Sequence, residues 1–568
     1  MSVFTLFDIG KSALNASRGG LDVTSHNIAN INTKNYSRQD IIVSAANPSR
    51  TAQGYFGRGA QVDNVVRHVD KFLESQIQQQ MQSVGSSTVL DEGMSQLEEI
   101  FNEQKGFGLA DRLTDFYKAW QEVANNPQAL SQRTVLLQNT GRLITAVSKQ
   151  TETRIKEVLN AKNKEIPTVV IQINKMTAEI AALSKQIVST EGGSEKEAND
   201  LRDKLDGSLK DLNEIIGVET LYDKNTGRLI VNAGQKTLIN GDIVNPVEAR
   251  LTTEDEYSIV IDDTDVTTKL KSGRLAGLLQ FSDTINNKVL KDLRRLMASI
   301  SKETNFVHQK GFGLDGSTGN DFFKPLDVGT KDYSKGTNIT SATITDMKAL
   351  NLHEYDIRFR SNTEYEIFDR DTEEVVGNGQ YVSGAPIEFG GMKVVIENVL
   401  LPPHGIVDTK TGLSKETEEP KFDMPKAGDK FLVSPLLHAV RDFQISVTDP
   451  AKIAASSTLD GLPGNNENAL QVIDMQNVGV ADLKDATFND YYNSLIVKVG
   501  RLSGEKKESA KFEENLLHEM QLKRESVSGV SLDEEAANLI RYQKAFEAAA
   551  RVINTADKLL DTLVNLGR

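Results

Sequence analysis

The fold of this chain is decided by residues 531–563, which read SLDEEAANLIRYQKAFEAAARVINTADKLLDTL. The stretch opens with Ser531-Leu-Asp-Glu534, a capping box in which glutamate follows a serine N-cap by three residues. Apolar residues then recur at steps of three and four, as they do on one face of an amphipathic helix. They are Leu532, Ala536, Leu539, Tyr542, Phe546, Ala549, Ile553, Ala556, Leu560 and Leu563. The pattern predicts a long C-terminal helix with a single apolar seam.

A matching seam lies at the other end of the chain. Phe7, Leu14, Leu21 and Ile28 recur every seven residues, and no proline occurs in residues 1–47 or after Pro463. Because proline breaks helix interiors, both ends are free to form long helices, and we expect the two terminal helices to pair. An isolated amphipathic hairpin is only marginally stable. We therefore expect the terminal helices to be weakly ordered in the free monomer and to be stabilised by copies or partners.

Helical and β-rich segments alternate between the two ends. Steps of three and four predict helices at residues 90–101, 109–123, 173–187 and 289–300. Strand patterns occupy residues 218–262, with a hairpin loop at Asp223–Gly227, and residues 340–448. There, Tyr355, Ile357 and Phe359 alternate with polar residues such as Asp356, which predicts a half-buried antiparallel strand. The proline-rich residues 402–425 are expected to form an exposed loop.

The predicted architecture is a nested α+β multidomain protein. Paired, coiled-coil-like N- and C-terminal helices and a helical rod domain carry inserted, mainly antiparallel β domains. The predicted division assigns residues 1–45 plus 526–568 to the terminal helical domain, 46–215 plus 282–318 plus 450–525 to the helical rod, 216–281 to a small β insert, and 319–449 to an outer β-rich domain.

Composition excludes several classes of function. The chain has 568 residues and no cysteine, so disulfides and cysteine nucleophiles are impossible. Its net charge of −15 argues against nucleic-acid binding. No apolar run is long enough for a transmembrane helix, and no signal-peptide pattern opens the chain. The hydrophobic content of 38% is low for this length and suits a protein whose surfaces are completed by neighbours.

The residue content offers no catalytic or metal-binding constellation. The seven histidines show no H-x-x-x-H spacing, and no G-x-S-x-G motif occurs. Gly10-Lys11-Ser12 lacks the first glycine of a phosphate-binding loop, and Asp262, Asp263 and Asp265 lack the spacing of a calcium loop. We therefore expect no enzymatic activity, no cofactor and no metal.

One N-terminal segment carries a family resemblance. Ser25-His26-Asn27-Ile28-Ala29-Asn30 resembles the signature that closes the first helix of bacterial flagellar rod, hook and hook-associated proteins. In that family Pro-Gly-Tyr commonly follows, whereas this chain has Lys34-Asn35-Tyr36. Asparagine tolerates the left-handed backbone conformation, so Asn35 can replace the turn glycine. We interpret His26 as a helix-end residue with satisfied hydrogen bonds and no chemical role.

The C-terminus narrows the resemblance to hook-associated protein 1, the branch found at the hook–filament junction. The stretch SGVSLDEEAANLIRYQ at residues 528–543 is similar to the end of that branch, as is AAARVINTAD at 548–557. Tyr36-Ser37-Arg38-Gln39 also fits this branch better than rod or hook proteins.

The resemblance implies a structural role. The terminal helices would line an axial tube as a ring or helical homo-oligomer, and the β domains would project outward. Implied partners are copies of the chain itself, the hook protein, a second junction protein on the filament side, and an export chaperone at the C-terminal helix. Implied localisation is the extracellular flagellum, reached by type III export without a cleaved signal peptide. Residues expected at subunit interfaces are Phe7, Leu14, Leu21, Ser25, His26, Asn27, Ile28, Ala29, Asn30, Tyr36, Leu539, Tyr542, Phe546, Ile553, Leu560 and Leu563.

Three alternatives stay open at this stage. The chain could be a rod or hook subunit of the same axial system. It could be an axial protein whose β insert carries a hydrolase, although no zinc-ligand spacing supports this. The β insert could also serve as an adhesin or surface-exposed module, which is compatible with the structural role.

Overall fold

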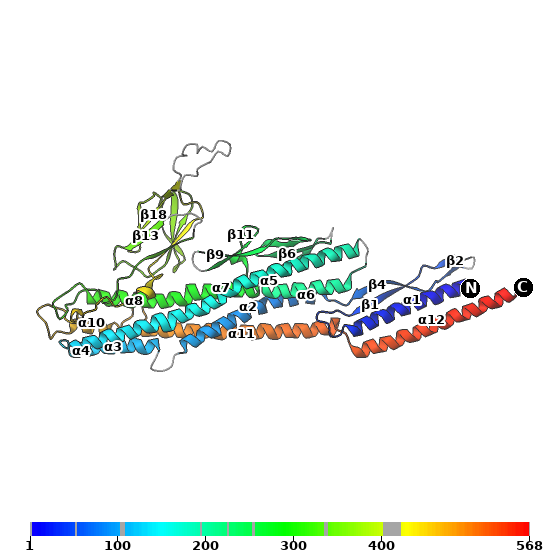
Figure 1. Ribbon diagram of the computed structural model, residues 1–568, viewed down its shortest axis with the longest axis horizontal. Coiled ribbons are helices and arrows are strands. Elements are labelled where there is room, and N and C mark those ends of the chain that lie inside the picture. Colours follow the sequence, from blue (N-terminus) through cyan, green and yellow to red (C-terminus); the bar gives the residue numbers. More distant parts are fainter. Residues whose placement is uncertain are drawn as a thin grey trace, which may run out of the picture. The chain divides into compact units, whose positions relative to one another are not determined.

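A computed structural model describes residues 3–51, 54–102, 108–192, 196–223, 227–252, 256–333, 339–400 and 422–566. The chain forms two compact units (Figure 1). The first unit contains residues 1–92, 162–281 and 505–568, and the second contains residues 93–161 and 282–504.

The first unit contains the two terminal helices and the small sheets. Its helices are α1 (Val3–Ala29), α6 (Asn199–Ile215), α12 (Leu532–Leu566), a short 3-10 turn (Thr267–Lys269) and parts of α2 (Lys71–Phe101), α5 (Thr153–Glu191), α7 (Gly273–Thr284) and α11 (Phe488–Ser528). Its strands are β1 (Gln39–Ala45), β2 (Ser49–Thr51), β3 (Gly54–Phe56), β4 (Ala60–Arg67), β5 (Glu219–Tyr222), β6 (Leu229–Ala233), β7 (Lys236–Asn240), β8 (Ile243–Val244), β9 (Val247–Leu251), β10 (Tyr257–Ile261) and β11 (Thr264–Asp265).

The two terminal helices pair as predicted. Helices α1 and α12 run antiparallel, and both chain ends lie at the same end of the pair (Figure 1). Gly10 faces Ile553, and Gly20 faces Tyr542, so the pair stays in register over much of α1. We call this pair the terminal hairpin.

The face that α1 turns inward differs from the predicted one. Its buried residues are small or polar: Gly10, Ser17, Gly20, Thr24 and Asn27. The apolar seam Phe7, Leu14, Leu21 and Ile28 is only half-buried on the flank of this face. Larger side chains of α12, such as Ile553 and Tyr542, fill the space that the glycines leave. The apolar periodicity of α1 thus did not identify its contact face, because close approach of two helices requires small residues on one of them.

Two adjacent glycines of α1 provide a matched test of this packing. A methyl group at Gly20 would lie 2.5 Å from the Tyr542 ring, whereas one at Gly19 would meet Val62 at an ordinary 3.6 Å. Gly20→Ala is expected to destabilise the terminal hairpin by about 1–3 kcal/mol through overpacking. Gly19→Ala is expected to stabilise α1 by about 0.5–1 kcal/mol, because alanine favours helix. Amide exchange over residues 5–30 should rank protection as Gly19→Ala, wild type, Gly20→Ala; equal exchange in the two variants would contradict this packing.

Strands β1 to β4 occupy most of the described residues between 39 and 67, where the predicted division placed helical rod from residue 46 onward. Strands β1 and β4 pair antiparallel with a bulge between Ile42 and Val43, and β2 pairs with β3 at the far end. We call residues 39–67 the β ribbon. Strand β4 lies against α1, and Val62 is close to Gly19.

The small β insert packs on helices, with one contiguous core. Strands β5-β6-β7-β8 form one antiparallel sheet, and β11-β10-β9 form another. Ile173 and Ile180 of α5 and Leu212 of α6 share this core with Leu238 and Ile259 of the sheets. The predicted seam at residues 173–187 and the hairpin after Asp223 are confirmed. Residues 224–226 at the tip of that hairpin lie outside the described residues.

The second unit combines helices with two larger sheets. Its helices are α3 (Leu109–Asn125), α4 (Leu130–Thr145), α8 (Lys291–His308), α9 (Ala439–Asp442), α10 (Glu467–Asp474), the remaining parts of α2, α5, α7 and α11, two π-helical segments (Ala146–Glu152 and Ile285–Leu290) and two 3-10 turns (Pro450–Lys452 and Ala481–Leu483). Its strands are β12 (Gly329–Asp332), β13 (Ile339–Ile344), β14 (Tyr355–Phe359), β15 (Glu364–Asp369), β16 (Glu374–Gln380), β17 (Pro386–Phe389), β18 (Met392–Glu397), β19 (Val399–Leu400), β20 (Phe422–Asp423) and β21 (Lys430–Ser434).

Strand β14 is buried more completely than its alternating pattern predicted. It is an inner strand of the five-stranded sheet β12-β21-β14-β15-β16. Tyr355, Ile357 and Phe359 belong to the core, as expected. Asp356 on the opposite face is also buried, with 1% of its area exposed, because Lys430 and Arg358 form ion pairs with its carboxylate. The predicted loop at residues 402–425 falls mostly outside the described residues.

The predicted fold class is confirmed. Long terminal helices pair, further helices form the body of both units, and every sheet among the described residues is antiparallel. The predicted four-part division of the chain stays a prediction.

Candidate functional site

The signature segment ends α1 and turns the chain back toward the β ribbon. The backbone N–H of Asn30 and its side-chain amide both donate to the His26 carbonyl oxygen, at 3.1 and 3.0 Å. Thr33 then donates to Asn30 from its backbone and its hydroxyl. Asn35 has φ +64°, the left-handed conformation predicted for it. The asparagines of this segment therefore satisfy the carbonyls at the helix end and reverse the chain.

The conformation of Asn35 makes a specific prediction. Asn35→Val should destabilise the turn by about 1–2 kcal/mol, because a β-branched residue strongly disfavours positive φ. Asn35→Gly should be nearly neutral, because glycine adopts this conformation freely. Thermal unfolding of the first unit would separate the two variants, and equal losses would show that the side chain of Asn35 matters more than its backbone.

The side chain of Asn27 makes three hydrogen bonds within the site. Its side chain is 1% exposed, its amide donates to the Gln39 carbonyl oxygen at 2.9 Å, and its Oδ1 accepts from the Tyr36 hydroxyl at 2.8 Å and from Gln39 N–H at 3.0 Å. One buried side chain thus ties the last turn of α1 to the start of β1. Burial, reinforced by Asp200 and Asp203, raises the pKa of Tyr36, so its hydroxyl stays protonated and donates to Asn27.

His26 has a structural role, as the sequence indicated. Its Nδ1 lies 3.0 Å from the Tyr36 hydroxyl oxygen, and the two rings meet edge to face at 5.7 Å. Because the Tyr36 hydrogen already points to Asn27, Nδ1 of His26 is the donor. Its Nε2 lies 3.6 Å from a carboxylate oxygen of Asp200 on α6. Both ring nitrogens therefore face polar partners within the chain.

Helix α6 is joined to the turn and to the β ribbon by one buried carboxylate, Asp203, and one half-buried carboxylate, Asp206. Asp203 accepts from the backbone N–H of Ser37 at 3.0 Å and from Arg67 of β4 at 2.7 Å. Arg67 also donates to Asp206 at 2.9 Å. Burial raises the pKa of Asp206 despite the neighbouring Arg67. The two carboxylates and one guanidinium connect α6 to both the turn and the β ribbon.

Arg524 at the end of α11 also binds this turn. Arg524 donates to the carbonyl oxygens of Asn35 and Tyr36, at 3.1 and 3.3 Å, and to Glu74 of α2 at 2.8 Å. Lys210 of α6 forms an ion pair with Glu74 at 2.6 Å. Burial alone would raise the pKa of Glu74, but Lys210 and Arg524 outweigh burial and hold the pKa below its usual range. Helices α2, α6 and α11 and the turn thus share one charged network.

Arg38 connects the turn to the start of α12. Its guanidinium donates to Glu534 and Glu535, both at 2.8 Å, and its backbone N–H donates to the Ser528 carbonyl oxygen at 2.9 Å. Helix α12 begins at Leu532, as the capping box predicted, and Glu535 N–H donates to the Ser531 carbonyl oxygen. We call the contacts of residues 26–39 with α6, α11 and α12 the polar junction.

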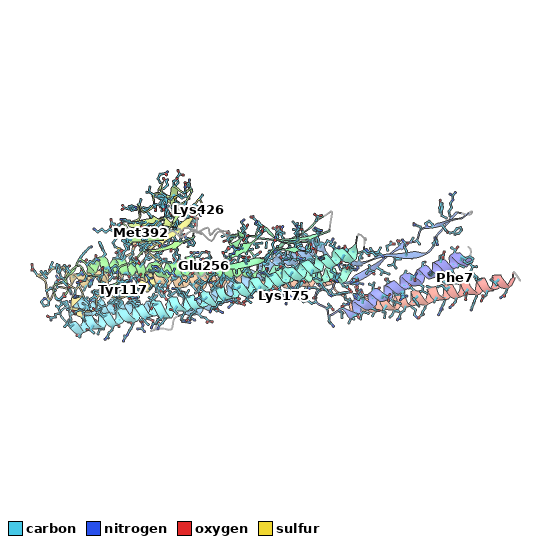
Figure 2. The ribbon with its side chains drawn as sticks, turned by 45° about the horizontal axis from the view of Figure 1, so that its top comes forward. Phe7, Tyr117, Lys175, Glu256, Met392 and Lys426 are labelled. Atoms are coloured by element: carbon cyan, nitrogen blue, oxygen red, sulfur yellow. The ribbon has the colours of Figure 1, made fainter. Side chains whose placement is uncertain are left out.

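The structure divides the predicted site residues into two groups. The signature residues Asn27, His26, Asn30 and Tyr36 form hydrogen bonds within the chain at the polar junction, whereas Ser25 and Ala29 are exposed. The seam residues lie along the terminal hairpin, where Figure 2 labels Phe7. Half-buried members are Phe7, Leu14, Leu21, Ile28, Leu539, Tyr542, Phe546, Ile553 and Leu560. The side chain of Leu563 lies outside the described residues. A role of these residues between subunits stays a prediction.

Sequence reasoning missed the partners that complete the junction. Asp203, Arg524 and Glu535 carry no local signal, because the turn residues that they contact are more than 160 residues away. The small face of α1 did carry a signal, since Gly10, Ser17 and Thr24 also recur every seven residues.

Other parts of the described structure offer no rival site. The described residues contain one group of possible metal ligands, His353, Asp369 and Asp371. Asp371 is already neutralised by Lys291 and Arg295, at 3.0 and 2.6 Å, and His353 binds Asp369 at 2.7 Å. These carboxylates serve as structural ion pairs. Among the helices that the structure describes, none has the length and apolar content needed to span a bilayer.

Family models match three parts of this chain. The helical domain of flagellar hook-associated protein FlgK matches residues 94–323. The flagella basal body rod protein model matches residues 7–36, and the C-terminal model of the flagellar basal body rod FlgEFG proteins matches residues 524–566. The terminal matches coincide with the terminal hairpin and the polar junction.

Individual proteins are similar over nearly the whole chain. Flagellar hook-associated protein 1 of Salmonella typhimurium is 28% identical, and that of Escherichia coli is 27% identical, with 99% of this chain and 100% of each relative covered. The solved structure of the flagellar hook junction protein FlgK from Burkholderia pseudomallei has the same fold, with a TM-score of 0.65 at 17% identity over 80% of this chain and 100% of that one. Over nearly its whole length, this chain is therefore similar to flagellar hook-associated protein 1 (FlgK).

Proposed function

We propose that this chain is a structural adaptor that joins the flagellar hook to the filament by assembling along the flagellar axis. The observation that carries the proposal is the terminal hairpin held by the polar junction. The hairpin buries a small-residue face inside the chain and leaves its larger apolar residues half-buried or exposed. Such a surface is typical of a module completed by neighbouring subunits.

The exposed part of this surface follows both helices. Phe4 of α1 is 73% exposed, and Ile540, Leu559 and Val564 of α12 are 58%, 44% and 58% exposed. Burying such side chains between copies would stabilise an assembly by about 1.5–3 kcal/mol for each one that becomes fully buried. Load between subunits would then pass through the hairpin and the polar junction into the first unit.

A charge placed on this surface tests the proposal. Leu559→Asp should abolish assembly at the junction while leaving the hairpin paired, because Leu559 is exposed in the monomer. Asn554→Asp adds the same charge at another exposed position of α12 and serves as the control. The readout is electron microscopy of a deletion strain carrying each variant. Hooks without filaments are expected for the deletion and for Leu559→Asp, and filaments attached to hooks in the Leu559→Asp strain would overturn the assignment. Ile553→Asp would test the hairpin itself, since Ile553 packs on Gly10.

The proposed partners are the hook protein, a second junction protein on the filament side, copies of this chain, and an export chaperone at the C-terminal helix. The proposed route to the flagellum is type III export without a cleaved signal peptide. Weak order of the terminal hairpin in the free monomer would suit both export and chaperone binding. Amide exchange on the monomer tests this order, and strong protection within residues 5–30 and 535–565 would contradict it.

The match of residues 94–323 to the FlgK helical domain favours this role over that of a rod or hook subunit. The rod-type models match the terminal segments only. Tagged protein should therefore be found at the hook–filament junction of purified flagella, and a position in the rod would favour the alternative.

A further inference from the structure

An open groove lies beside the polar junction. Its volume is about 1010 Å³, and it runs between the turn after α1, the side of α2 and the end of α11. Apolar side chains from these elements line it: Ile31, Ile77, Met81, Val84, Leu517 and Val527. The described residues of this chain leave the groove open, although its size would accept an aromatic side chain from another molecule.

The positive charges in the groove are paired with acids, and further acids line the groove beside them. Its cations have partners: Lys210 and Arg524 pair with Glu74, and Lys34 pairs with Asp211. Two further acids, Glu214 and Glu525, also line the groove and are exposed. The groove therefore combines an apolar patch with a polar, negative rim that includes Glu214 and Glu525.

The tip of the β ribbon has the complementary character. Tyr55 is 72% exposed, Phe56 is 36% exposed, and residues 49–58 contain Arg50 and Arg58 but no acid. Large exposed aromatic side chains with neighbouring arginines are typical of residues that anchor protein interfaces.

The ribbon tip lies far from the groove of its own chain. Arg58 forms an ion pair with Asp8 at 3.3 Å, near the start of α1, whereas the groove begins beyond its end at Ala29. At a rise of 1.5 Å per residue the two features are about 30 Å apart along α1. An occupant from this chain's ribbon must therefore come from another copy.

We propose that the ribbon tip of one copy, with Tyr55 as anchor, docks into the groove beside the polar junction of the next copy. The proposal rests on the proposed self-assembly and names the surfaces that it uses. Tip and groove are different surfaces, so the contact is head-to-tail and repeats from copy to copy. The offset of about 30 Å along α1 places successive contacting copies at different heights, which gives a helical rather than a flat arrangement.

Cysteine cross-linking tests this contact, because the natural chain contains no cysteine. The double variant Tyr55→Cys with Met81→Cys, expressed as the sole copy, is oxidised in purified hook–filament junctions. Dimers and higher oligomers linked by disulfides are expected. A mixture of the two single variants should give dimers only. The matched control combines Met81→Cys with Leu221→Cys, another exposed apolar position at 56% exposure, and should stay monomeric.

The outcomes separate this contact from the proposed function. Junctions that form normally but give no Tyr55–Met81 cross-link would overturn the docking proposal and leave the adaptor role intact. Absence of the protein from the junction would overturn both. A Met81→Cys adduct to a different flagellar protein, rather than to a second copy, would also overturn the docking proposal.

A charge exchange provides the second measurement. Arg50→Glu should lower the cross-link yield several-fold by placing a negative charge against the negative rim. Adding Glu525→Arg to the same chain should restore the yield. Arg50 and Glu525 are both exposed, so neither change removes a buried contact. An unchanged yield in Arg50→Glu would contradict the role of charge in the contact.

Discussion

Replacing Asn27 with alanine is expected to release the turn that joins α1 to the β ribbon. Asn27 supplies one hydrogen bond to Gln39 O and accepts two, from Tyr36 and from Gln39 N–H, at a site that is 1% exposed. Alanine would leave all three groups without this partner. Unsatisfied buried groups cost about 1–3 kcal/mol each, so we expect a loss of about 3–5 kcal/mol in the local free energy of opening.

Amide exchange followed by mass spectrometry would measure this loss directly. Exchange over residues 31–40, in the turn beyond the terminal hairpin, should accelerate by about 100-fold or more, since each 1.4 kcal/mol corresponds to a factor of ten. Ser25→Ala is the matched control within the same signature, because Ser25 is exposed and its removal should change exchange little. If Asn27→Ala exchanged like Ser25→Ala, the turn would be held by Arg524 and Asp203 alone.

The same variant connects stability with function. Release of the turn would uncouple the terminal hairpin from α6 and α11 without altering the apolar surface of the hairpin. We therefore expect Asn27→Ala to weaken the attachment of filaments to hooks under shear, while the protein still reaches the junction. Attachment as strong as in wild type would show that the polar junction does not carry load.

Local features of this fold were predictable, and distant pairings were not. The left-handed Asn35 followed from residue type and position, because asparagine is among the few residues that tolerate positive φ. The start of α12 followed from its capping box. The network that surrounds the turn could not be predicted, since Asp203 and Arg524 meet residues 35–37 only after the chain folds. In a chain with 80 acidic residues, no carboxylate stands out by type alone.

The two terminal helices pair as predicted, but the residues of α1 that make the contact could not be identified from hydrophobicity. Hydrophobic periodicity identified the apolar seam of α1, but hydrophobicity does not report how closely two helices approach. Gly10 and Gly20 allow α12 to come near, which turns Leu14 and Leu21 to the flank. The flank position leaves apolar surface available for the contact with a neighbouring copy that we propose.

The second unit is expected to lose stability as the pH falls, and His308 contributes to this loss. His308 is fully buried, its Nδ1 lies 2.7 Å from the Asn320 carbonyl oxygen, and its Nε2 accepts from Ala454 N–H at 2.8 Å. Nε2 must stay unprotonated to accept this bond, so the folded unit holds neutral imidazole. Burial, with a smaller contribution from the nearby Arg133, lowers the pKa of His308 from 6.5 to about 4, although the hydrogen bond to Asn320 opposes the shift.

The direction of the pH effect follows from the pKa of His308 in the unfolded chain, 6.5, and in the folded unit, about 4. Above pH 6.5 the histidine is neutral in both the folded and the unfolded chain, and its contribution is fully present. As the pH falls from 6.5 toward 4, the unfolded chain binds a proton that the folded unit does not, so the free energy of unfolding decreases. A pKa difference of this size corresponds to a loss of about 3 kcal/mol.

Tryptophan fluorescence isolates this effect, because Trp120 is the only tryptophan and its ring lies 6.4 Å from that of His308. Urea unfolding between about pH 7 and about pH 4 should give a steeper loss of stability for wild type than for His308→Gln. The variant is expected to be less stable at neutral pH, since glutamine replaces only one of the two hydrogen bonds. His518→Gln removes an exposed histidine and serves as the control for the wild-type slope. Acidic groups titrate in all three proteins, so the difference between the slopes belongs to His308, and parallel slopes for His308→Gln and wild type would contradict a neutral buried imidazole.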